Sequence, residues 1–138
     1  MNYFDKEIIT DLKTHNIGFQ TLTDAEHKII VHEINKKIPF SSSKIDWKIL
    51  KNSHIFFYEP LSIAALQLAE KIREVSDGNL IFVGDSACDE AYSIAPESLE
   101  QALKLFSELP QHTYILQSSL NWIACISFEG DIDFARLP

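Results

Sequence analysis

The chain is poor in cysteine, glycine and long apolar runs. Its two cysteines, Cys88 and Cys125, are too few for a disulfide framework and lie in no zinc-binding motif. Its four scattered glycines form no phosphate-binding loop. No run approaches the roughly 18 apolar residues of a membrane span, and the mixed charges of residues 1–7 do not resemble a secretory signal. We therefore expect a single cytoplasmic globular domain over 1–138, with no metal and no cofactor.

Basic residues are almost missing from the second half of the chain. The residues up to Ser76 hold ten acids and ten bases, whereas those from Asp77 onward hold ten acids against Lys104 and Arg136. The whole net charge of −8 therefore lies in the second half. Such a charge disfavours binding to nucleic-acid phosphates and favours a basic partner. The alternative is that it serves only solubility.

The clearest structural pattern lies in residues 111–137. Three short runs rich in β-branched and aromatic residues, separated by turn residues, predict an antiparallel meander. Because side chains alternate along a strand, Asp131 and Asp133 are expected on one face. The other, apolar face is expected to contain Trp122, Ala124, Ile126, Phe128, Ile132 and Phe134. An apolar sheet face requires a covering layer of helices.

Upstream of the meander the spacing of apolar residues predicts four helices. They cover 4–16, where Gly18 is placed to end the helix, and 23–38, which starts with a capping box at Thr23. The others follow Pro60 and Pro96, and proline suits the first helical position.

Two buried strands are expected at 54–58 and 80–83, on either side of the third helix. A strand, a helix and a strand over about thirty residues predict a right-handed crossover with parallel pairing. Residues 84–93 are expected to form an acidic loop, and 45–50 are compatible with either strand or helix. The predicted fold class is α+β, a mixed sheet whose C-terminal antiparallel meander packs against four helices.

The block Gly84-Asp85-Ser86 after the second strand resembles the nucleophile block of GDSL-type serine hydrolases. A serine nucleophile needs a base to take its proton, and no histidine follows His112. The block is therefore interpreted first as a strand exit containing glycine. Acidic neighbours disfavour the thiolate of Cys88, so a catalytic cysteine is not expected either.

Two acidic segments, 85–92 and 129–133, are the candidate partner-binding sites. Acidic residues with an accessible aromatic side chain are typical of protein interfaces. Trp122 and Phe134 are assigned to the core, which leaves Tyr92 as the free aromatic. The candidate partner-binding residues are Asp85, Asp89, Glu90, Tyr92, Glu129, Asp131 and Asp133.

The segment from Asn121 to Phe134 is similar to the ending of small bacterial immunity proteins. These pair with contact-dependent growth inhibition toxins and related polymorphic toxins. The likeness is carried by Trp122, by the acidic hairpin at 129–133 and by Phe134, and it fixes no contact residues. It implies a non-enzymatic inhibitor that binds one cognate toxin C-terminal domain, such as a nuclease with a basic surface. The alternatives are a small serine hydrolase using Ser86 and a subunit of another complex; the oligomeric state stays open.

Overall fold

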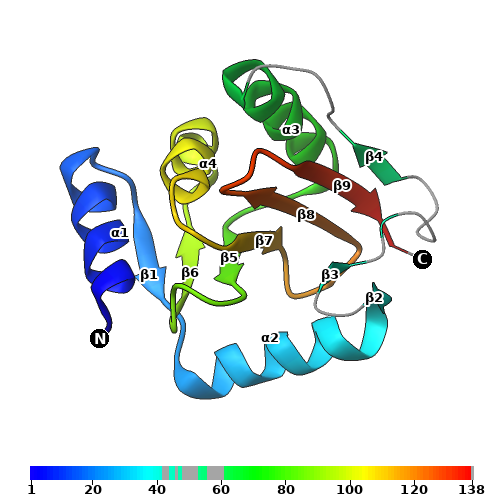
Figure 1. The fold of residues 1–138 in the computed structure, drawn as a ribbon, viewed down its shortest axis with the longest axis horizontal. Helices are drawn as coiled ribbons and strands as arrows, with labels where there is room; N and C mark the ends of the chain where they lie inside the picture. Colours follow the sequence, from blue (N-terminus) through cyan, green and yellow to red (C-terminus); the bar gives the residue numbers. More distant parts are fainter. Residues whose placement is uncertain (42–43, 46, 48–52, 56–60, 138) are drawn as a thin grey trace.

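The fold is α+β: the part of the chain that the structure describes has four α-helices and a seven-stranded sheet that includes the predicted meander (Figure 1). The computed structural model describes residues 1–41, 44–45, 47, 53–55 and 61–137. Among them no helix has both the length and the apolar character needed to cross a membrane. In chain order the elements are α1 (Tyr3–Thr14), β1 (Phe19–Thr21), α2 (Asp24–Lys37), β2 (Phe40–Ser41), β3 (Lys44–Ile45), β4 (Ser53–Ile55), α3 (Leu61–Val75), β5 (Leu80–Gly84), β6 (Ala91–Ile94), a 3-10 turn (Pro96–Ser98), α4 (Leu99–Ser107), β7 (His112–Leu116), β8 (Trp122–Ser127) and β9 (Ile132–Arg136).

The strand order is β1-β6-β5-β7-β8-β9-β4, and every pairing described is antiparallel. The parallel pairing predicted for the strands before and after α3 is therefore wrong. β4 lies at one edge beside β9, whereas β5 pairs with β6 and β7. The cause is β6, a strand within the expected loop 84–93, which folds back on β5 as a hairpin and occupies that side of it.

Helix ends follow local chemistry. The predicted capping box is present, since the Thr23 hydroxyl accepts from Glu26 N–H and the Glu26 carboxylate from Thr23 N–H. The first helix ends differently from the prediction. Asn16, with φ 56°, adopts the left-handed conformation expected of Gly18, and Ile17 N–H donates to Leu12 O at 2.9 Å. The predicted strand residues 56–58 and much of 45–50 lie outside the described part.

Both faces of the sheet are covered. On the first face, α3 and α4 pack over the predicted apolar row on β8 and β9, and α1 packs against α4 (Figure 1). Within this layer Trp122 stacks on Phe134. The second face was expected to be polar, but α2 covers it through Ile30, Ile34 and Ile38. Phe128 was placed in the first-face core, but it follows the end of β8 and is 63% exposed.

Candidate interface at one end of the sheet

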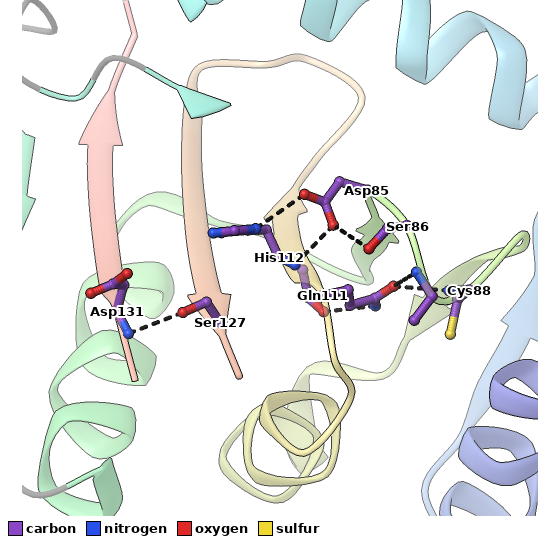
Figure 2. Close-up of polar contacts among 9 residues, drawn as sticks. Asp85, Ser86, Cys88, Gln111, His112, Ser127 and Asp131 are labelled. Carbon is purple, nitrogen blue, oxygen red and sulfur yellow. Dashed lines mark hydrogen bonds and ion pairs between the residues drawn. The ribbon is translucent and has the colours of Figure 1, made fainter. Parts of the chain in front are cut away.

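The two acidic segments meet at one end of the sheet, which we call the acidic end. There β5 and β8 finish and β6, β7 and β9 begin, because neighbouring strands are antiparallel. Asp85 N–H donates to His112 O at 3.1 Å, and Ser127, which pairs with His112, donates its N–H to Asp131 O at 3.0 Å. Figure 2 shows Asp85, His112, Ser127 and Asp131 in sequence across this end.

Asp85 is held by its neighbour on β7. Its Oδ1 accepts from His112 N–H at 2.9 Å, and its Oδ2 lies 3.1 Å from His112 Nδ1 (Figure 2). The Ser86 hydroxyl donates to Asp85 Oδ1 at 3.2 Å. Ser86 is thus bonded to a carboxylate and not to an imidazole, which is the group a serine nucleophile requires as its base.

Gly84 allows the Gln111 side chain to pack closely against the backbone. The buried side chain of Gln111 lies against it, and a Cβ at this position would overlap the Gln111 amide. Gln111 Oε1 accepts from the N–H groups of Ala87 and Cys88 at 3.1 and 2.9 Å, and its Nε2 donates to Thr113 Oγ1 at 2.9 Å (Figure 2). Glycine therefore lets Gln111 hold the turn that carries the acidic residues.

A buried carboxylate from α1 holds the same turn from the first face. Asp5 is fully buried, and it accepts hydrogen bonds from Asp89 N–H at 2.9 Å, from Glu90 N–H at 3.3 Å and from the Tyr92 hydroxyl. These bonds fix the backbone from which the Asp89 and Glu90 side chains project. Neither Asp5 nor Gln111 belongs to a sequence motif, so neither was among the candidate site residues.

Tyr92, nominated as an accessible partner contact, is instead completely buried. It lies in β6, with its ring centroid 5.9 Å from that of Phe106. Burial is the largest cause that raises its pKa, and the hydrogen bond to Asp5 is the next. Cys88 is also buried, and burial, with Asp5 as the next cause, raises the pKa of its thiol to about 12. Neither side chain presents itself to a partner in this structure.

Of the remaining candidates, Asp85, Asp89, Glu129 and Asp131 are exposed, Glu90 is half-buried and Asp133 is buried. Asp133 lies on the predicted face, but its side chain is only 8% exposed. It pairs with Cys125 in the register of β8 and β9. Burial, and secondly the Asp131 carboxylate, raise the pKa of Asp133 to about 6, while His112 opposes the shift. The accessible part of the candidate interface is thus smaller than predicted.

The raised pKa of Asp133 predicts a pH-dependent stability. An acid whose pKa is higher in the folded chain contributes stability fully below its unfolded pKa of about 3.9, and this is lost as the pH rises through about 6. Replacing Asp133 with asparagine should therefore raise the free energy of unfolding at pH 7.5 by about 2 kcal/mol and change it little at pH 4. Urea denaturation at both pH values measures this. Glu129→Gln, an exposed control, should alter neither value, and a parallel pH profile for parent and Asp133→Asn would refute the assignment.

The basic residue of β9, Arg136, does not offset these acids. Arg136 lies at the far end of β9, opposite Trp122, with its Nη2 3.7 Å from Glu74 Oε2. Within the described residues, no three histidine, cysteine or carboxylate side chains are placed to hold a metal ion.

In comparisons with known proteins, no family model, no curated protein and no solved structure matches the chain.

Proposed function

We propose that this protein is an immunity protein of a bacterial toxin system, which binds a cognate toxin domain through the acidic end and neutralises it in the cytoplasm. The observation that carries the proposal is the meeting of two distant acidic segments at one end of the sheet. Asp85, Asp89 and Asp131 are all exposed there. A surface with this charge complements a basic partner, such as the substrate-binding surface of a nuclease toxin.

An exposed aromatic residue accompanies these charges. Phe128 is 63% exposed, and its N–H donates to Gln111 O at 3.3 Å, which places it beside the turn that carries Asp85. Large aromatic side chains surrounded by polar residues are common energetic centres of interfaces. Phe128 therefore takes the anchoring role that the sequence had suggested for Tyr92.

Charge reversal at the acidic end tests the proposal. The double variant Glu129→Lys, Asp131→Lys should slow association with a cognate toxin domain by more than about tenfold at low salt, because it removes electrostatic steering. Stopped-flow association rates measured at several salt concentrations supply the answer. The difference in rate between parent and variant should shrink as salt rises. At physiological ionic strength, exposed charges more than about 8 Å apart are largely screened from each other.

A matched control uses the opposite end of the sheet. Asp77 and Glu97 are exposed, and Asp77 precedes β5 while Glu97 follows β6. The double variant Asp77→Lys, Glu97→Lys makes the same change in net charge and should leave the rate within about twofold of the parent. Equal slowing by both double variants would show a general charge effect and would remove the acidic end as the interface.

A further inference from the structure

A cavity of about 260 Å³ opens between α2 and the second face of the sheet, beside the acidic end. Its walls combine apolar side chains with a small number of polar groups. The apolar part comes from Val31 and Ile34 of α2 and from Val83 of β5. The remaining lining residues are Asn35, Gly84, Asp85 and Tyr114. Apolar walls with a few convergent polar groups are the usual composition of a ligand site.

Tyr114 supplies an aromatic side chain with a hydroxyl group to the lining of this cavity. Its side chain is only 6% exposed. Burial is the main cause that raises its pKa, and Cys125, Asp85 and Asp133 raise it further. A phenol oxygen can accept a hydrogen bond, so Tyr114 is one of the few polar groups that could contact a ligand in this cavity.

The charge at the cavity is negative. Asp85 Oδ2 has His112 Nδ1 as its only described hydrogen-bond partner, so this oxygen can accept another donor. No lysine or arginine is found among the described residues that line the cavity. Lys28 lies one turn before Val31 on α2, in a neighbouring depression with His27 and His32 that shares Val31 with this cavity. A second cavity, of about 330 Å³, contains Glu26, but that carboxylate already caps α2.

We propose that the cavity is an anchor pocket for one arginine or lysine side chain of the protein partner. The inference rests on the proposed function and deepens it. The aliphatic stem of such a side chain would pack on Val31, Ile34 and Val83, while its charged head donates to Asp85 Oδ2 and to the Tyr114 oxygen. The pocket would then contribute specificity at an interface whose outer charges mainly accelerate encounter.

The pocket can be tested on the isolated protein with n-butylguanidinium as the probe. Titration of the ¹⁵N-labelled protein should give saturable shifts centred on the Gly84 and Tyr114 amides. The neutral isostere n-butylurea should bind at least about fivefold more weakly, because it forms no charge-assisted hydrogen bond. Val31→Phe, which fills the cavity without changing charge, and Asp85→Asn should each weaken guanidinium binding by about tenfold.

The matched control is Asp89→Asn, which removes the same charge from an exposed carboxylate outside the lining. It should leave the affinity within about twofold of the parent. Shifts that do not saturate, or equal losses in Asp89→Asn and Asp85→Asn, would overturn the anchor pocket without touching the charge-reversal test. Saturable binding together with an unchanged toxin association rate in Glu129→Lys, Asp131→Lys would overturn the proposed function, and with it the assigned occupant.

Discussion

Replacing Trp122 with alanine should lower the free energy of unfolding by about 3–5 kcal/mol. The side chain is 1% exposed and stacks on Phe134, with ring centroids 6.2 Å apart. Removing it leaves a large cavity under α3 and α4, and a domain of this size has only about 5–15 kcal/mol of stability in total. A chemical denaturation curve gives the loss directly. Toxin binding by the fraction that remains folded should stay unchanged, because Trp122 lies far from the acidic end.

Two further variants separate packing from recognition. Trp122 Nε1 is buried and has no hydrogen-bond partner among the described residues, so Trp122→Phe should lose less than Trp122→Ala by about 2 kcal/mol. Asp131→Lys should behave in the opposite way, with little change in melting and a clear loss of binding. If Trp122→Ala melted like the parent but no longer bound, the tryptophan would be an exposed anchor and the assignment of the two faces would be inverted.

Replacing Asp5 with alanine should cost about 3 kcal/mol or more, because three buried or half-buried donors lose their acceptor at once. These are the N–H groups of Asp89 and Glu90 and the hydroxyl of Tyr92. The loss should appear locally as well as globally. Hydrogen exchange at the Asp89 and Glu90 amides should accelerate more than at the β8 amides, since the turn opens before the sheet.

The variant Tyr92→Phe provides a smaller change for comparison with Asp5→Ala. It removes one of the three donors and leaves the other two bonded, so the expected loss is about 1–2 kcal/mol, with protected amides at Asp89 and Glu90. If Asp5→Ala cost under about 1 kcal/mol and both amides kept their protection, the turn would be held without Asp5, by its other contacts such as those to Gln111.

Local patterns predicted the elements that depend on local physics. The capping box at Thr23 and the alternation that buries Trp122 and Ile126 are both present. The apolar face of α4 was also predicted, since Leu103 and Phe106 are buried against the sheet. Each of these signals acts within a few residues along the chain, which is the range over which sequence periodicity is informative.

The missed features depend on partners distant in sequence. Asp5 looks like an ordinary acidic residue in the first turn of a helix, and its partner Asp89 lies 84 positions later. The strand β6 has four residues, too few for a periodic pattern, and it exists because β5 and β1 pair with it on both sides. Burial of Tyr92 follows from that pairing. Sequence reasoning could therefore mark the two acidic segments as candidates, but which of their side chains reach solvent depended on tertiary packing.

The strand order also has a consequence for the order in which the molecule folds. The two edge strands come from the first half of the chain, yet within the described residues β1 pairs with β6 alone and β4 with β9 alone. Both pairings join residues separated by more than half the chain, such as Phe19 with Ile94 and Ser53 with Ala135. High contact order of this kind slows folding. During synthesis β1 cannot make its sheet pairing until β6 emerges, and β4 cannot make its own until the meander is complete.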